Sequence, residues 1–299
     1  MSVPRDVWGR QPRPYALLGW PVGHSLSPAM HNAAFREQGL QAIYVALAVP
    51  PEALGEAVRG LASLGFGGAN VTIPHKEAVL DYLDEVTPEA RLIGAVNTIV
   101  CRHGRLVGHN TDGQGFLRHL YAEGIDPAGQ NAVILGAGGA ARAIAAALAA
   151  AGVQTLVVAG RTPERAEAVA GLARRAASAA GTEVEATAVP LPSREAELCL
   201  ADAHLVVNCT PVGMAPATEE SPLPDGLGGL RPGTVVYDTV YRPAETRLLR
   251  EARARALVTV GGLGMLVHQG ALAWELWFGR PGPVQVMWAA AEAALRGED

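Results

Sequence analysis

The 299-residue sequence predicts an α/β fold with two domains. Short apolar segments typical of buried strands alternate with amphipathic helical patterns along most of the chain. A glycine-rich turn at 136–139 separates one such strand from an alanine-rich helix, which is the arrangement of a Rossmann-type dinucleotide-binding domain. We therefore expect an N-terminal α/β domain at 1–113, completed by C-terminal helices at 263–299, and a Rossmann-type domain at 114–262.

The first domain is expected to contain four strands and four helices. Runs rich in apolar and β-branched residues predict the strands Tyr15–Gly19, Ile43–Ala48, Ala69–Thr72 and Ala95–Cys101. Apolar positions at helical spacing predict helices at Pro28–Gln38, Pro51–Leu64, His75–Tyr82 and Pro88–Ile93.

A helix from about Asp112 to Glu123 and a turn at 126–129 lead into the alternating pattern of the second domain, which starts around residue 114. Strands are expected at Ala132–Leu135, Thr155–Ala159, Val184–Ala188, Leu205–Asn208, Val235–Tyr237 and Val258–Val260. Helices of this domain are expected at Ala140–Ala151 and Pro163–Ala177, and the C-terminal helices that complete the first domain are expected at Met265–Trp277 and Val284–Leu295. The Pro/Gly-rich stretch 211–232 is expected to be an exposed loop beside a site, and Trp274, Trp277 and Trp288 are expected in the core.

Composition narrows the functional classes. A net charge of −5 and dispersed arginines argue against a nucleic-acid partner. The three cysteines, Cys101, Cys199 and Cys209, form no C-x-x-C pair, so we expect a reducing compartment, buried thiols and neither a disulfide nor a zinc site. No secretory signal or membrane-spanning segment is visible, and a cytoplasmic protein is expected. His24 and His31 lack metal-ligand spacing, and His24 is expected to bond within its loop.

The segment Gly136-Ala137-Gly138-Gly139-Ala140-Ala141 is a G-x-G-x-x-A motif between a predicted strand and helix. Its glycines permit a tight turn and a close approach of backbone N–H groups to a pyrophosphate, while Ala141 allows the helix to pack closely. At the end of the next strand, an NAD-selective site would place an acidic residue, whereas this chain has Gly160-Arg161-Thr162. Arg161, with Thr162 and Arg165, can bind a 2′-phosphate, so NADP is expected rather than NAD.

Polar side chains gather in four segments of the first domain: 23–32, 70–76, 94–98 and 110–113. We expect each to join a strand end to a helix start, where α/β enzymes bind ligands. Ser25, Ser27, Thr72 and Asn97 are neutral donors and acceptors, and Asp112 is a carboxylate. Lys76 is the only lysine among 24 cationic side chains. A lysine can give up its proton in a closed site, which arginine cannot, so Lys76 is expected to take part in proton transfer. Ser27 and Asp112 could instead be helix N-caps.

The chain resembles the shikimate dehydrogenase family over about residues 14–290. The resemblance is carried by H-S-x-S-P-x-x-H-N, N-V-T-x-P-x-K, G-A-V-N-T, N-T-D-G, G-A-G-G-A-A-R and an R-T step, in that order. It continues through Asn208–Met214, then Asp238 with Tyr241-x-Pro243-x-x-Thr246, and then Gly264-Met265-Leu266-x-x-Gln269. Two departures are Gly160 in the family's N-R-T and Gly261 in its D-G before L-G-M-L.

The resemblance implies a role for each matching residue. Ser25 and Ser27 would hold the carboxylate of shikimate, with Tyr241 near it, while Thr72, Asn97, Asp112 and Gln269 would hold its hydroxyls. Lys76 and Asp112 would be the catalytic pair. The cofactor would contact the residues Gly136, Ala137, Gly138, Gly139, Ala140, Arg161, Thr162, Arg165, Thr210, Val212, Met214, Gly262 and Met265.

The resemblance also implies the reaction, which is NADPH-dependent reduction of 3-dehydroshikimate to shikimate on the pathway to chorismate and aromatic amino acids. The expected binding partner is a small molecule, and no metal is expected. The protein is expected to be a monomer or a homodimer. Two alternatives stay open: a broader quinate/shikimate dehydrogenase using NAD, and a shikimate-binding regulator that has the fold without turnover.

Overall fold

The computed structural model describes residues 11–223 and 227–297. The first ten residues, to which the expectation about a secretory signal applies, and residues 224–226 of the expected loop at 211–232 lie outside the described residues. The chain divides into two compact units. One holds the described residues up to Gly115 and from Val267 onward, and the other is Phe116–Leu266. Both are α/β units, and C-terminal helices belong to the first, so the expected fold class is confirmed.

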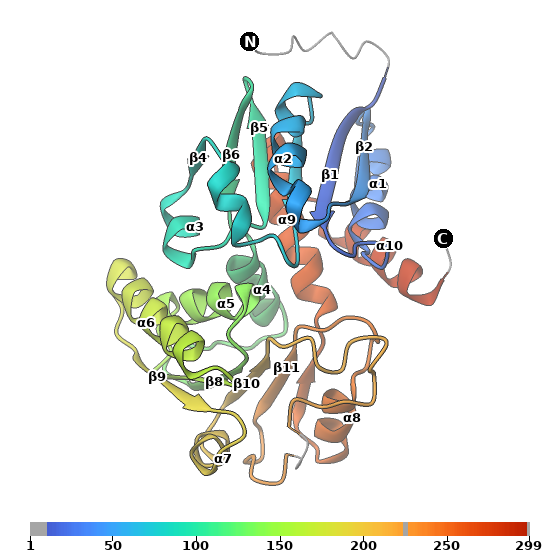
Figure 1. Cartoon of the computed structure of the whole chain (residues 1–299). Coiled ribbons are helices and arrows are strands. Elements are labelled where there is room, and N and C mark those ends of the chain that lie inside the picture. Colours follow the sequence, from blue (N-terminus) through green and yellow to red (C-terminus); the bar gives the residue numbers. More distant parts are fainter. Residues whose placement is uncertain (1–10, 224–226, 298–299) are drawn as a thin grey trace. The chain divides into compact units, whose positions relative to one another are not determined.

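The first unit is built on a mixed six-stranded sheet of order β2-β1-β3-β5-β6-β4 (Figure 1). Strands β1, β2 and β3 are parallel, whereas β5 runs antiparallel to β3 and to β6. The elements are β1 (Arg13–Gly19), α1 (Ser27–Glu37), β2 (Ala42–Ala48), η1 (Pro51–Ala53), α2 (Leu54–Ser63), β3 (Gly68–Val71), η2 (Ala78–Tyr82), β4 (Glu85–Val86), α3 (Pro88–Ile93), β5 (Thr98–Arg102), β6 (Arg105–His109) and the start of α4 (Asp112–Ala122).

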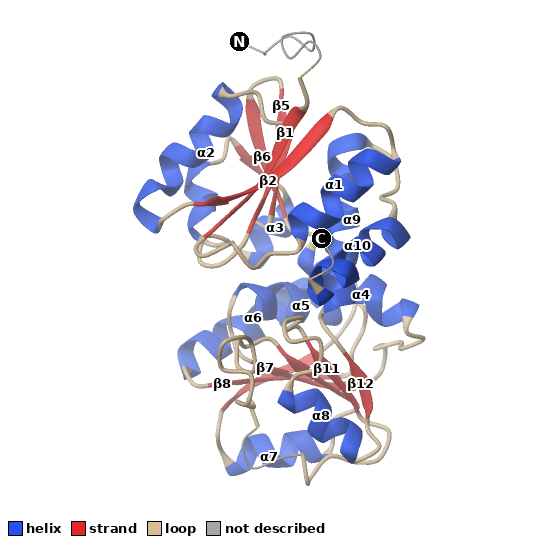
Figure 2. Cartoon of the chain, turned by 90° about the vertical axis from the view of Figure 1, so that its right-hand side faces the viewer, coloured by secondary structure: helices blue, strands red, loops and turns tan. Residues whose placement is uncertain are grey.

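Helices cover both faces of this sheet, α2 on one side and α1, α9 (Leu263–Phe278) and α10 (Val284–Arg296) on the other (Figure 2). On the α2 side, Leu54, Val58 and Leu61 pack into the buried apolar cluster of the sheet. On the other side, Tyr15 lies 4.9 Å from Trp277, ring centre to ring centre. Such aromatic contacts hold the C-terminal helices on the first unit.

The second unit is a parallel six-stranded sheet of order β12-β11-β10-β7-β8-β9. Helices α5 and α6 cover one face, and α7 and α8 cover the other (Figure 2). The elements are β7 (Asn131–Leu135), α5 (Gly139–Ala150), β8 (Thr155–Gly160), α6 (Pro163–Ala180), β9 (Glu185–Pro190), α7 (Arg194–Ala201), β10 (Leu205–Asn208), β11 (Val235–Asp238), α8 (Arg247–Ala254) and β12 (Val258–Val260).

The order of this sheet reverses between β7 and β10, because β8 and β9 follow on one side and β11 and β12 on the other. Such a reversal leaves a crevice outside the carboxyl ends of the two central strands, where α/β proteins bind nucleotides. The G-x-G-x-x-A motif follows β7 directly, so it lies at this position.

Several local expectations were wrong. The segment His75–Tyr82 is a turn followed by the 3₁₀ helix η2, and the strand expected from Ala95 begins at Thr98. The segment 94–98 therefore joins a helix end to a strand start, since Gly94 ends α3 in the left-handed conformation with φ of 71°. Strands β4 and β6 and helices α7 and α8 were not expected.

Some side chains are also less buried than expected. Cys101 is buried, whereas Cys199 and Cys209 are half-buried, and none of the three forms a disulfide bond. Trp288 is half-buried, and its Nε1 donates to Glu292 rather than entering the core. His24 is exposed, and none of the described hydrogen bonds includes its ring.

Within residues 11–223 and 227–297, no three His, Cys, Asp or Glu side chains gather in an arrangement able to hold a metal ion. No helix in that part of the chain is long and apolar enough to cross a membrane.

Candidate active site

Lys76 is held in place through its neighbours on the loop after β3. The buried His75 ring lies 2.7 Å from the Val49 carbonyl oxygen through Nε2. The Lys76 carbonyl itself accepts a hydrogen bond from the Val96 N–H at 2.8 Å. The backbone around Lys76 is thus fixed on two sides, while its side chain remains 18% exposed.

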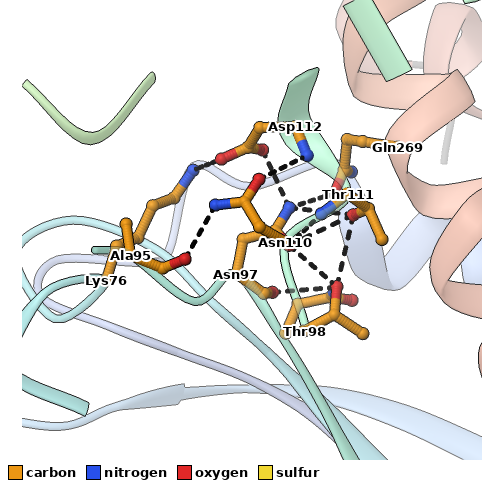
Figure 3. A network of polar contacts seen from close by, with 9 residues as sticks. Lys76, Ala95, Asn97, Thr98, Asn110, Thr111, Asp112 and Gln269 are labelled. Atoms are coloured by element: carbon orange, nitrogen blue, oxygen red, sulfur yellow. Dashed lines mark hydrogen bonds and ion pairs between the residues drawn. The ribbon is translucent and has the colours of Figure 1, made fainter. Parts of the chain in front are cut away.

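The Lys76 ammonium points at Asp112, the first residue of α4 (Figure 3). Its Nζ donates to Asp112 Oδ2 at 2.6 Å, and the carboxylate is almost fully buried. An ion pair this short and shielded from water is a strong, charge-assisted hydrogen bond. Asn110 fixes the backbone at Asp112, because its Oδ1 accepts the Asp112 N–H at 3.0 Å and its amide donates to the Ala95 carbonyl.

Asn97 lies at the centre of the cluster. Its Nδ2 contacts Asp112 Oδ1 at 2.8 Å, Thr111 Oγ1 at 2.9 Å and Gln269 Oε1 at 3.3 Å, and its Oδ1 accepts the Thr111 N–H at 2.8 Å. An amide nitrogen has two protons, so these three acceptors share them. Asn97 thereby joins Gln269 of α9 to the Lys76–Asp112 pair (Figure 3).

A buried chain of hydrogen bonds runs from Asn97 toward Ser27. Thr98 Oγ1 contacts Asn97 and accepts from Asn70 Nδ2 at 3.0 Å. Asn70 Oδ1 in turn accepts the Tyr44 hydroxyl at 2.8 Å, and the Ser27 side chain is hydrogen-bonded to the same hydroxyl. The sequence reasoning missed Tyr44, because it lies within an apolar strand pattern.

Ser25 and Thr72 lie on other loops of the same unit. Ser25 Oγ accepts the Ser27 N–H at 3.2 Å, and the Thr72 N–H donates to the Leu18 carbonyl at 2.9 Å. Both side chains are half-buried. No hydrogen bond among the described residues joins either one directly to Lys76 or Asp112.

The glycine-rich turn lies in the second unit. Gly136 has φ of 105°, a conformation that side chains disfavour, and a Cβ there would lie 2.9 Å from Thr210 Cγ2. Gly138 precedes α5 in an extended conformation, and no side chain in the described part of the chain caps the first N–H groups of α5. A Cβ at Gly138 would meet no atom within 4 Å. These N–H groups, with open space before them, fit a bound pyrophosphate. The remaining residues of the motif, Ala137, Gly139 and Ala140, belong to the same turn and the first turn of the helix.

Polar groups shape the loop after β10, where Thr210, Val212 and Met214 lie. Asn208 Oδ1 accepts both the N–H and the hydroxyl of Thr210, and Thr210 Oγ1 accepts the Val212 N–H at 3.2 Å. The Asn208 amide donates to the buried Asp238 at 2.9 Å. Burial raises the pKa of the Asp238 carboxyl, while its bonds to Thr246, Val240 and Asn208 oppose that rise.

Arg161, Thr162 and Arg165 lie where β8 passes into α6, and all three are exposed. Thr162 is the residue before the first helical turn, and Arg165 lies in that turn. No carboxylate stands between Gly160 and Pro163. Two guanidinium groups beside a helix N-terminus fit a phosphate better than a neutral ribose.

Gly262, Met265 and Tyr241 also belong to the second unit. The Gly262 N–H donates to the Val240 carbonyl at 3.3 Å, and Met265 is buried in the first turn of α9. Tyr241 is half-buried on the loop after β11.

Family models match three segments of the chain. Residues 17–99 match the shikimate dehydrogenase substrate binding domain, 120–213 match shikimate / quinate 5-dehydrogenase, and 262–292 match the shikimate 5′-dehydrogenase C-terminal domain. A curated relative from Symbiobacterium thermophilum, shikimate dehydrogenase (NADP(+)), is 60% identical over 94% of both chains. The chain belongs to the shikimate dehydrogenase family.

Solved shikimate dehydrogenase structures agree in fold. The shikimate 5-dehydrogenase of Thermus thermophilus, in complex with NADP(H) and shikimate, is 44% identical with a TM-score of 0.82, covering 94% of this chain and 99% of that one. The quinate dehydrogenase of Corynebacterium glutamicum, in complex with NAD, is 36% identical with a TM-score of 0.83, covering 95% and 99%. The solved structures that resemble this chain thus include one named for shikimate, with NADP(H) bound, and one named for quinate, with NAD bound.

Proposed function

We propose that this protein is an NADP-dependent shikimate dehydrogenase, which reversibly reduces 3-dehydroshikimate to shikimate. The observation that carries this function is the Lys76–Asp112 ion pair of 2.6 Å within a buried hydrogen-bonded cluster. The reaction is a step of the pathway toward chorismate and the aromatic amino acids. Membership of the family and relatives named as NADP enzymes support it.

Reduction of a ketone needs a hydride and a proton. The nicotinamide of NADPH supplies the hydride, and this chain supplies the proton. Lys76 Nζ is a protonated donor and faces Asp112, so it can give a proton to the developing alkoxide oxygen and take it back in the oxidative direction. Asp112 keeps the ammonium oriented and offsets the charge change. A positioned general acid of this kind accelerates a reaction by about 10²–10⁴-fold.

For the substrate, we assign the carboxylate to the hydroxyls of Ser25 and Ser27, with Tyr241 near it. The hydroxyls of shikimate are assigned to Thr72, Asn97, Asp112 and Gln269. The hydrogen bonds from Asn97 to Asp112 and Gln269 support this assignment, because they gather three of these side chains. On this proposal, residues 1–113 with 263–299 bind the substrate and 114–262 bind the cofactor.

For the cofactor, we assign the pyrophosphate to the turn at 136–140 and the 2′-phosphate to Arg161, Thr162 and Arg165. Thr210, Val212 and Met214 are also assigned to the cofactor, and the nicotinamide is assigned to Gly262 and Met265. The two arginines and the lack of a carboxylate at the end of β8 favour NADP over NAD. We further propose a cytoplasmic monomer or homodimer without a nucleic-acid or membrane partner.

One observation favours a second candidate, a quinate/shikimate dehydrogenase using NAD. Gly160 replaces the family's asparagine beside Arg161, and the quinate dehydrogenase of Corynebacterium glutamicum, solved with NAD, is 36% identical. A shikimate-binding regulator without turnover is the third reading, and the short Lys76–Asp112 pair disfavours it.

Initial rates of nicotinamide reduction test all three. The purified chain is assayed with shikimate and with quinate, each with NADP⁺ and with NAD⁺. The proposal expects shikimate with NADP⁺ to dominate. Comparable rates with quinate or NAD⁺ would favour the second candidate, and shikimate binding without any rate would favour the regulator.

A further inference from the structure

Tyr237 of β11 is fully buried, and it is not among the residues assigned above to the substrate, the cofactor or proton transfer. Its hydroxyl lies 2.7 Å from His119 Nδ1, and its ring meets Phe116 edge to face with centres 4.8 Å apart. A buried tyrosine hydroxyl without partners would cost stability, so such groups are placed where they can hydrogen-bond. The same hydroxyl has a second hydrogen-bond partner.

That second partner is the backbone of Met265, which is hydrogen-bonded to the Tyr237 hydroxyl. Met265 is the third residue of α9, and the first N–H groups of a helix have no acceptor within the helix. Tyr237 therefore satisfies the start of α9 from a neighbouring strand. Burial raises the pKa of Tyr237 well above its usual value, so the hydroxyl keeps its proton.

The tautomer of His119 sets the direction of its bond to Tyr237. When His119 carries its proton on Nε2, which faces Glu123 Oε1 at 3.5 Å, its Nδ1 accepts the Tyr237 hydroxyl proton, while the hydroxyl oxygen accepts from Met265. The hydrogen-bonded series is thus Met265, Tyr237, His119 and Glu123.

The same imidazole packs against Gly264. A Cβ at 264 would overlap the His119 ring, although the backbone of Gly264 is not in the left-handed region. The glycine is needed here for the close approach of the ring. At Gly262 a Cβ would overlap the Thr239 carbonyl, so the segment 262–265 is confined on both sides.

We propose that Tyr237, itself held by His119, is a positioning residue that sets the first turn of α9 for the nicotinamide end of the cofactor. This inference rests on the proposed function, in which Gly262 and Met265 lie beside the nicotinamide. Small displacements of groups that orient reacting atoms are costly to rate, so a residue that fixes this turn acts on binding and turnover together.

The test compares NADP⁺ with 2′,5′-ADP, which carries the phosphorylated adenosine half and no nicotinamide. Dissociation constants are measured by calorimetric titration of the full chain. Tyr237→Phe is expected to weaken NADP⁺ binding about fivefold and to leave 2′,5′-ADP binding unchanged, as fits the loss of one hydrogen bond. Tyr15→Phe, the same change at a buried tyrosine of the first unit, is the control and should leave both constants unchanged.

Variants at His119 provide a second arm that does not remove the tyrosine. His119→Asn keeps a polar amide near the Nδ1 position, whereas His119→Leu removes the acceptor. We expect His119→Leu to follow Tyr237→Phe and His119→Asn to stay close to the wild type. The ratio of the two dissociation constants does not depend on the fraction of folded protein, so a loss of stability alone cannot mimic the effect.

Equal weakening of both ligands, or no change in either, would overturn the positioning role while leaving the proposed function intact. A wild-type chain that binds neither NADP⁺ nor 2′,5′-ADP would instead overturn the proposed function, and this inference with it.

Discussion

Asn97 Nδ2 donates to Asp112 Oδ1 at 2.8 Å, while Lys76 Nζ donates to the other oxygen of the same carboxylate at 2.6 Å. Both oxygens of the carboxylate are thus engaged by fixed donors before any substrate arrives. The orientation of Lys76 depends on Asn97 as well as on Asp112.

Asn97→Ala should lower kcat/KM for shikimate about 10- to 100-fold, because it removes a hydrogen bond to a buried charged group. Steady-state kinetics with saturating NADP⁺ measure this. The matched control is Asn131→Ala, which removes an amide-to-carboxylate bond of 2.7 Å to Asp202 in the second unit. Equal rates for both variants would contradict the arrangement.

Lys76→Arg keeps a positive charge, but the guanidinium group cannot give up its proton at ordinary pH. We expect kcat to fall about 10²–10⁴-fold with little change in melting temperature. Kinetics and thermal denaturation together distinguish lost chemistry from lost folding. Turnover at the wild-type rate would exclude Lys76 as the proton donor.

Arg161→Gln should reduce kcat/KM for NADP⁺ about tenfold or more and leave the value for NAD⁺ unchanged, since only NADP⁺ has a 2′-phosphate. Arg194→Gln is the control, because it removes an exposed arginine of the same unit that pairs with Glu197. If the control changed NADP⁺ kinetics equally, the effect would be general electrostatics rather than recognition.

His31→Phe should make stability less dependent on pH. Burial lowers the pKa of His31 from 6.5 to about 3, and neither ring nitrogen has a hydrogen-bond partner among the described residues. Between pH 3 and pH 6.5, the unfolded chain therefore binds a proton at His31 that the folded chain does not bind. This contribution to stability is therefore complete above pH 6.5 and falls as the pH drops toward 3.

The size follows from linkage at about 1.4 kcal/mol per pH unit, so the wild type should lose roughly 2 kcal/mol more than His31→Phe between pH 7.5 and pH 5. Phenylalanine retains the stacking on Tyr44, whose ring lies 4.5 Å away. Denaturant unfolding at the two pH values measures the difference. Parallel pH profiles for the two proteins would show that His31 is not neutral and buried in solution.

Gly68→Ala should destabilise the first unit by about 1–3 kcal/mol or more, because a Cβ there would overlap the Trp277 ring and lie 2.7 Å from the Ile99 carbonyl oxygen. Gly23→Ala is the matched control, since a Cβ at that position would meet no atom within 4 Å. Denaturant midpoints compare the two. Similar midpoints would mean that the Trp277 ring can move aside.

The sequence allowed the fold class to be predicted because the parallel strands of the second unit are continuous apolar runs punctuated by glycine turns. It did not allow β6 to be predicted, since Arg105–His109 has polar ends and few apolar positions. The tight turn before β6 is formed by His103 and Gly104, both of which have positive φ. Helices α7 and α8 are rich in charged residues, which obscured their apolar stripe.

The sequence predicted which polar residues belong to the candidate site, but it did not predict all of the hydrogen bonds that join them. The segments named from sequence contain Lys76, Asn97 and Asp112, which the structure brings together. The link through Tyr44 to Ser27 depends on the register of β2 beside β1 in the folded sheet, which a local pattern does not specify. The roles assigned to these side chains stay predictions.

The single lysine makes the site addressable by amine chemistry. Acylating reagents or reductive alkylation can modify only one lysine side chain in this sequence, that of Lys76. This side chain is 18% exposed and is paired with the buried carboxylate of Asp112. The mass added to the peptide containing Lys76 would therefore report how often the pair opens. Slower labelling in the presence of shikimate would give a binding curve without any turnover.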